Sequence, residues 1–150
     1  MTKIFFGCSM RGGFQNVSQE DLRNIVASIE SLGHTLMSKH QTSINFTAEE
    51  SPYSAQEIHD RDYHWLEGAE LGVFEISNPS LGAGGEISDM THMQKPVLCI
   101  YKKEVEPVVS AYIVGKANSP HIKSKFVCQS YESLEEAKRV IQKFINSCEQ

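Results

Sequence analysis

The sequence predicts a single α/β domain, a doubly wound five-stranded parallel sheet with helices on both faces. Three observations predict it. Short apolar segments bounded by turn residues alternate with longer segments whose apolar residues recur at helical spacing. Ser18, Ser54 and Ser133 each precede such a helical segment and can cap it. The 150 residues contain no repeat and no linker, and they are enough for one domain with its own core.

The elements are predicted in a strictly alternating order. Helices are expected from Ser18 to Gly33, after Ser54, from Glu86 to about Gln94, at 108–116 and after Ser133. The polar segment 41–53 contains Pro52 and is expected to be a loop. Five strands joined by helices favour the flavodoxin-like order 2-1-3-4-5. The strands are expected at 4–8, 34–40, 71–76, 97–101 and 125–129.

Composition excludes several classes of protein. The net charge of −5 and the lack of a basic stripe argue against nucleic acid as a partner. No apolar run approaches the roughly 18 residues of a membrane span, and no signal peptide is expected. The four cysteines form no CxxC pair, so we expect neither a disulfide framework nor a metal site, and a cytoplasmic location.

Two glycine-rich segments follow strands that the expected order places side by side. Residues 9–13 (SMRGG) follow the first strand and residues 78–85 (NPSLGAGG) follow the third. Ligands bind at the carboxyl ends of the strands, where strand order reverses, and this point lies between those two strands. Backbone N–H groups at Gly12 and Gly13, with the Arg11 side chain, suit an anionic ligand. The alternative is that both segments are ordinary tight turns.

Two carboxylates are candidates for chemistry in this crevice. Glu86 is expected in the first turn of a helix, where the dipole keeps it ionised; the alternative is simple dipole complementation. Asp62 shares the apolar face of its helix, so it is either paired or used as a proton donor. Such a pair is the arrangement that breaks glycosidic bonds. Glu75 ranks below them, and His40 is a candidate at the rim of the crevice.

Three segments together resemble a known family. They are GCSMRGG after the first strand, IHDRDYHWLEGAE on the second long helix and ISNPSLGAGGEIS after the third strand. They look like 2′-deoxynucleoside 5′-phosphate N-hydrolases, within the wider nucleoside 2-deoxyribosyltransferase superfamily. The resemblance extends along nearly the whole chain and implies a flavodoxin-like homodimer that needs no metal or organic cofactor. It implies cleavage of a deoxynucleoside monophosphate into free base and deoxyribose 5-phosphate.

The resemblance also implies roles for individual residues. Glu86 matches the nucleophilic glutamate, and Asp62 matches the second carboxylate, which orients the reacting groups or assists departure of the base. Ser110 matches a serine that reaches the phosphate bound by the neighbouring subunit. The remaining residues expected to contact the substrate are Phe5, Ser9, Met10, Arg11, Gly12, Gly13, His40, Ser80 and Gly82.

The chain departs from the family pattern at three places. Phe5 stands where the hydrolases carry tyrosine, and related cytidine monophosphate hydrolases that accept ribose have phenylalanine there. Gly85 stands where the hydrolases often have tyrosine. Segment 41–53 has no clear match, which leaves the base preference open.

Three functions remain alternatives at this stage. A deoxyribosyltransferase acting on unphosphorylated nucleosides would leave Arg11 and Ser110 without a phosphate to hold. A cytidine monophosphate N-glycosidase would accept ribose. A nucleotide or flavin binder without activity is disfavoured because SMRGG lacks the Ser/Thr-rich loop of flavodoxins.

Overall fold

The computed structural model describes residues 1–11, 13–38, 43 and 45–150. All pairings between neighbouring strands are parallel, and the strand order is β2-β1-β3-β4-β5. The predicted fold class and strand order are therefore confirmed. The strands are β1 (Lys3–Cys8), β2 (Thr35–Leu36), β3 (Leu71–Glu75), β4 (Val97–Lys102) and β5 (Phe126–Tyr131).

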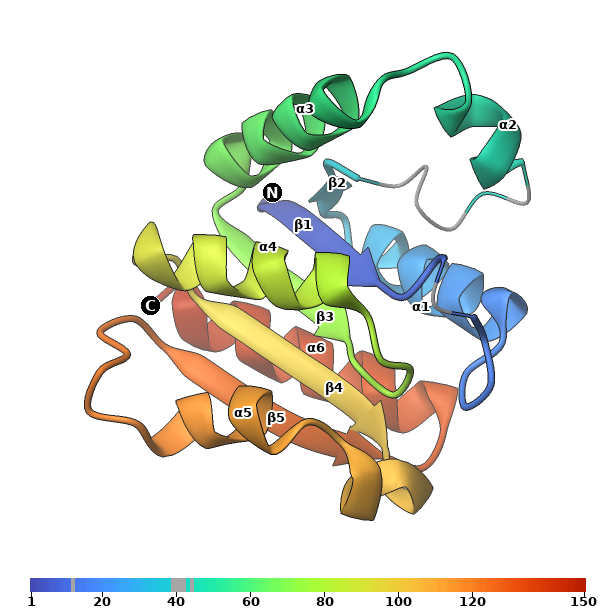
Figure 1. Cartoon of the computed structure of the whole chain (residues 1–150). Coiled ribbons are helices and arrows are strands. Elements are labelled where there is room, and N and C mark those ends of the chain that lie inside the picture. Colours follow the sequence, from blue (N-terminus) through green and yellow to red (C-terminus); the bar gives the residue numbers. More distant parts are fainter. Residues whose placement is uncertain (12, 39–42, 44) are drawn as a thin grey trace.

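Helices cover both faces of the sheet (Figure 1). On one face, α1 (Gln19–Ser31) and α6 (Leu134–Cys148) bury Ile25 and Ile141 against the strands. On the other face, α3 (Ala55–Gly68) and α4 (Leu81–His92) enclose a second cluster that includes Leu66 and Met90. The sheet is thus buried on both sides, as its continuous apolar strands require.

The predicted helix starts at Ser18, Ser54 and Ser133 are confirmed. Each serine side chain accepts a hydrogen bond from the backbone N–H three residues later. Such a cap contributes about 1 kcal/mol by satisfying a donor that the helix leaves open. At Ser54 the Glu57 carboxylate also accepts from the Ser54 N–H at 2.7 Å, which completes a capping box.

Four predicted boundaries are wrong. Helix α4 begins at Leu81, so Gly82, Gly84 and Gly85 belong to the helix. Segment 41–53, expected as loop, contains α2 (Phe46–Glu50). Strand β2 ends at Leu36, well before residue 40. In place of one helix over 108–116, α5 (Ala111–Val114) is followed by the 3₁₀ turn Gly115–Asn118, and a separate 3₁₀ turn, Lys103–Val108, precedes them.

The physical reasons for these differences are local. Ser80 caps α4 by accepting from the Ala83 N–H at 3.1 Å, so the helix starts there although glycines follow. Pro107 lacks an N–H and its ring crowds the preceding turn, so Lys103–Val108 does not form a regular α-helix, and the Ser110 cap starts α5 only at Ala111. Among the residues that the structure describes, no helix is long and apolar enough to cross a membrane.

Candidate active site

The two glycine-rich segments meet at the carboxyl ends of β1 and β3. These strands pair in parallel, with Cys8 beside Glu75 in the last register position. Asn78, just beyond β3, accepts a hydrogen bond from the Asn16 N–H at 2.7 Å and donates to the Val17 carbonyl at 3.0 Å. Asn16 in turn donates to the Ser77 carbonyl at 2.8 Å. The loops after β1 and β3 are therefore fixed to each other at the point where strand order reverses.

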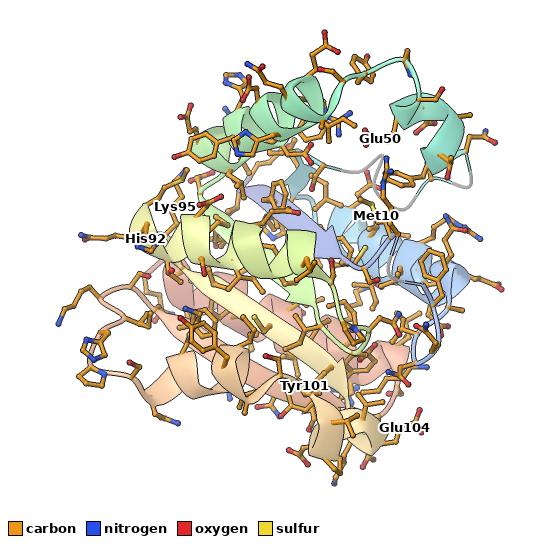
Figure 2. All side chains as sticks on the ribbon, in the orientation of Figure 1. Met10, Glu50, His92, Lys95, Tyr101 and Glu104 are labelled. Carbon is orange, nitrogen blue, oxygen red and sulfur yellow. The ribbon has the colours of Figure 1, made fainter. Side chains whose placement is uncertain are left out.

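The loop after β1 is closed by Ser9. This serine is buried, and its hydroxyl donates to the Gly13 carbonyl at 3.2 Å. Gly13 has φ of 97°, a conformation that suits glycine. Met10 is half-buried and packs against the core beneath the loop (Figure 2). Arg11 is exposed, with its guanidinium 6.0 Å from the centre of the Phe46 ring in α2.

Glu86 lies in the second turn of α4, not in the first turn as the sequence predicted. Its carboxylate nevertheless points back toward the start of the helix, because side chains on a helix tilt toward its N-terminus. A Cβ placed on Gly82 would lie 3.9 Å from both Glu86 Oε1 and the Ser80 hydroxyl. The carboxylate thus lies beside Gly82 near the positive end of α4.

Glu86 also lies within electrostatic range of β1. Burial is the largest cause of the raised pKa of Cys8, and the charges of Glu75 and Glu86 raise it further. The side chain of Glu86 is partly exposed, whereas its Oε2 atom is shielded from solvent. An acidic side chain from α4 therefore reaches the end of the strand that carries the SMRGG loop.

Asp62 is half-buried on α3, as its position on the apolar face predicted. Its side chain is 17% exposed, and Oδ1 accepts hydrogen bonds from Arg61 Nε at 3.0 Å and from Arg61 Nη2 at 2.8 Å. Helix α3 contacts α4 on the same face of the sheet. Lys95, after α4, donates to the carbonyls of Leu66 and Glu67 at the end of α3 (Figure 2).

Glu75 has a structural environment. It is buried, and it accepts hydrogen bonds from the Tyr131 hydroxyl and from the backbone and hydroxyl of Ser77. Burial raises the pKa of its carboxyl, and these bonds and the charge of Lys102 offset only part of the rise. Glu75 thereby holds the turn that leads to Asn78.

The other candidates lie in different settings. Phe5 is fully buried and packs on Phe74, with 5.8 Å between ring centres, so its contact with a ligand stays a prediction. Ser110 is exposed at the start of α5 and accepts from the Ile113 N–H at 3.4 Å. His40 and Gly12 lie outside the described residues.

Sequence reasoning missed three residues beside Asp62. Arg61 connects Asp62 to the buried Glu50 of α2, and the Trp65 ring lies 4.7 Å from the Arg61 guanidinium. Glu50 lies in segment 41–53, which was expected to be a loop. The sequence therefore carried no indication that Glu50 contacts Arg61. In the described part of the chain, no group of three or more His, Cys, Asp or Glu side chains is placed to hold a metal ion.

Two surface hollows lie away from these carboxylates. One, of about 420 Å³, runs along α6 and is lined by residues such as Arg139 and Asn146. The other, of about 170 Å³, lies near Asp21, Lys102 and Tyr131. Neither Asp62 nor Glu86 lines either of these two hollows, so the volume of a hollow does not indicate the candidate site.

Comparisons with known proteins bear on this arrangement. No protein-family profile matches the chain. A 5-hydroxymethyl-dUMP N-hydrolase of Tetraodon nigroviridis is 30% identical over 147 residues, which cover 97% of this chain and 98% of that protein. This chain belongs to the 2′-deoxynucleoside 5′-phosphate N-hydrolase family. The predicted class, a nucleotide N-glycosidase, is thereby confirmed.

Other relatives agree with this membership. A 2′-deoxynucleoside 5′-phosphate N-hydrolase of Syntrophotalea carbinolica is 32% identical, over 89% of this chain and 87% of that protein. Among solved structures, a CMP N-glycosidase from Clostridium botulinum aligns with a TM-score of 0.63 at 16% identity, covering 93% of this chain and 98% of the other. The structural match shows that this N-hydrolase family member has the same fold as the CMP N-glycosidase.

The hydrogen bonds of Asn78 are expected to stabilise this N-hydrolase family member against unfolding. Replacing Asn78 by Ala leaves the Asn16 N–H and the Val17 carbonyl without their partner, so the free energy of unfolding should fall by about 1–3 kcal/mol. Urea unfolding checks this, and amide exchange should speed up in both loops. Asn24→Ala on α1 is the control, because Asn24 is exposed and its side chain bonds to neither of these two loops in the described residues. An unchanged midpoint for Asn78→Ala would contradict the prediction.

Proposed function

We propose that this chain hydrolyses the N-glycosidic bond of nucleoside 5′-monophosphates, with Glu86 as the nucleophile and Asp62 as the second carboxylate. One observation carries the assignment. The Glu86 carboxylate folds back beside Gly82 and Ser80 at the start of α4, next to the end of β1. Family membership supports the reaction class. Because relatives in this family are 5-hydroxymethyl-dUMP N-hydrolases, a deoxynucleotide is the first substrate to test.

The reaction has two steps, formation of a covalent sugar ester on Glu86 and its hydrolysis by water. A Glu86 oxygen bonds to the anomeric carbon of the sugar while the carbon–nitrogen bond breaks, and the electron pair leaves with the base, which takes up a proton. Water then attacks the anomeric carbon of the resulting ester, which frees the sugar 5-phosphate and restores the carboxylate. One water is consumed for each base released. Asp62 either orients the reacting groups or assists departure of the base.

The phosphate is assigned to the start of α4 and the loop after β1. The N-terminus of a long helix attracts anions, and Ser80 and Gly82 lie there. Arg11 is exposed on the neighbouring loop and can offer two donors to phosphate oxygens. An anchored phosphate would fix the sugar relative to Glu86, and such positioning contributes a large part of the rate in enzymes.

Sugar selectivity is assigned to Phe5. No hydroxyl is present at this position, and its ring belongs to the buried cluster beneath α3 and α4. A tyrosine there would add one polar group that has to find a partner. We therefore expect this chain to discriminate less strictly against ribose than a member with tyrosine does.

Replacing either carboxylate by its amide tests the assignment. Glu86→Gln should lower kcat by about 10³-fold or more, because the amide is a poor nucleophile, and Asp62→Asn by about 10²-fold or more. Free base is measured by chromatography after incubation with ribo- and deoxynucleoside monophosphates. Asp60→Asn is the matched control, since Asp60 is exposed on the same helix as Asp62. Wild-type protein that releases no base from any nucleotide would refute the proposal.

Gly82 offers a test in which stability and activity move in opposite directions. Gly82→Ala should raise the free energy of unfolding by up to about 1 kcal/mol, because alanine favours a helix. It should lower kcat/KM, because the added methyl would occupy space beside Glu86 Oε1 and the Ser80 hydroxyl, where the substrate is proposed to bind. Gly84→Ala is the control, since its Cβ meets nothing within 4 Å and should stabilise without loss of activity. Equal activity in the two variants would contradict this role of Gly82.

We also propose that the chain acts as a homodimer in the cytoplasm, with Ser110 reaching the phosphate bound by the partner. Ser110 is exposed between Val108 and Tyr112, whose side chains are 76% and 78% exposed. Leu81, at the start of α4, is fully exposed. Large apolar side chains exposed beside a polar one are typical of an association surface. The four free thiols suit a reducing compartment.

The dimer proposal predicts that a variant that cannot form the dimer also loses activity. Tyr112→Glu should give a monomer by sedimentation with low activity, because a charge at a buried interface is costly. Ser110→Ala should remain a dimer with KM raised about tenfold, the effect of one hydrogen bond to a charged group. Ser119→Ala is the control serine outside α5. A strictly monomeric and fully active protein would rule out a shared site.

A further inference from the structure

The side chain of Asp62 is held by its neighbour in the sequence. Arg61 Nε and Nη2 both donate to the same oxygen, Asp62 Oδ1, at 3.0 and 2.8 Å. Two bonds to one oxygen restrict rotation of the carboxylate, so the direction of Oδ2 is set as well. Adjacent helix residues do not normally face each other, so a further contact is needed to bring Arg61 to this position.

That further contact comes from α2. Arg61 Nη2 also donates to Glu50 Oε1 at 2.8 Å, and the Glu50 side chain is only 1% exposed. Figure 2 shows Glu50 between α2 and α3. The Arg61 guanidinium lies 4.7 Å from the centre of the Trp65 ring and 5.7 Å from that of Tyr53. Arg61 is thus fixed by one carboxylate and two rings before it reaches Asp62.

The charge of Arg61 is secure in this setting. Partial burial by itself would lower the pKa of Arg61, but the hydrogen bonds and charges of Glu50 and Asp62 outweigh it and raise that pKa. A buried carboxylate such as Glu50 is costly and adds little stability over an apolar residue. The role of Glu50 is therefore explained better by the position that it imposes on Arg61 than by stability.

We propose that Arg61, anchored by Glu50, is the positioning residue that aims the Asp62 carboxylate at the reacting sugar. This inference rests on the proposed role of Asp62. It also gives a purpose to α2, the short helix that the sequence did not predict. Phe46 of this helix contacts Arg11 of the loop after β1, and Glu50 contacts Arg61 of α3. One short helix therefore touches both the proposed phosphate loop and the support of the second carboxylate.

A double-mutant cycle with kinetics tests the proposal. Arg61→Gln should lower kcat about tenfold or more, with KM changed less than about threefold, because charge-assisted hydrogen bonds that aim Asp62 are lost. Arg61→Lys should recover part of kcat. In the Asp62→Asn background, Arg61→Gln should cost less than about twofold more. A full additional loss in that background would overturn the proposal, because Arg61 would then act independently of Asp62.

Two further variants guard against misfolding. Arg61→Gln leaves Glu50 buried without its cation, so the paired variant Glu50→Gln/Arg61→Gln removes both charges together and should show the same loss of kcat. Arg139→Gln, exposed on α6 on the opposite face of the sheet, is the matched control and should keep wild-type kcat. A folded paired variant with wild-type kcat would overturn the proposal.

A structural readout separates this inference from the proposed function. Crystal structures of the wild-type protein and the paired variant should show that the Asp62 carboxylate turns or takes two conformers once Arg61 is replaced. An unchanged carboxylate would overturn the role of Arg61 even if the enzyme proves fully active. If no nucleotide is cleaved, the proposed function fails, while the carboxylate's position still decides what Arg61 does.

Discussion

The reversal of strand order between β1 and β3 determines where chemistry can occur in this chain. From β1 the chain passes to α1 on one face of the sheet, and from β3 it passes to α4 on the other face. The two loops would separate at this point, but Asn78 ties them together through Asn16 and Val17. The Asn78 side chain is buried, so its hydrogen bonds are worth more than those of an exposed pair. A ligand that binds both loops therefore meets a preformed surface.

Two of the candidate carboxylates lie on helices that cover the same face of the sheet. Asp62 on α3 and Glu86 on α4 belong to adjacent helices that pack over the same cluster of side chains. Glu75 comes from the strand beneath, and its hydrogen bonds are used to hold the turn after β3. The carboxylates thus have different surroundings: the hydrogen bonds of Glu75 hold a turn, whereas Asp62 is hydrogen-bonded to Arg61.

The sequence was sufficient for the fold class because the information is local and repeated. Capping serines, apolar strands and helical spacing each gave an independent indication of the same alternating order. The start of α4 was misplaced because glycines normally indicate a loop, yet the Ser80 cap lets them adopt helical angles. Segment 46–50 was missed because so short a helix carries no readable period, and its stability comes from contacts made by side chains such as Glu50.

In the candidate site, too, the features that depend on local sequence could be predicted and those that depend on tertiary contacts could not. The glycines, Glu86 and Asp62 were predicted from motif and helix face, since both are properties of neighbouring positions in the sequence. Arg61 was not found, because its contact with Asp62 depends on Glu50, eleven residues earlier on another helix. Interactions of this kind are set by tertiary packing, and a single sequence carries no period or spacing that indicates them.

The glycines at the start of α4 have a consequence for folding energetics. Three of the first five residues of this helix are glycines, and each costs about 1 kcal/mol relative to alanine. The end of the helix that faces the site is therefore its least stable part, and local opening there is inexpensive. An anion that binds only the ordered turn stabilises that turn against local opening by its binding free energy. Binding of a ligand at this end and ordering of the first turn of α4 are therefore thermodynamically linked, so each favours the other.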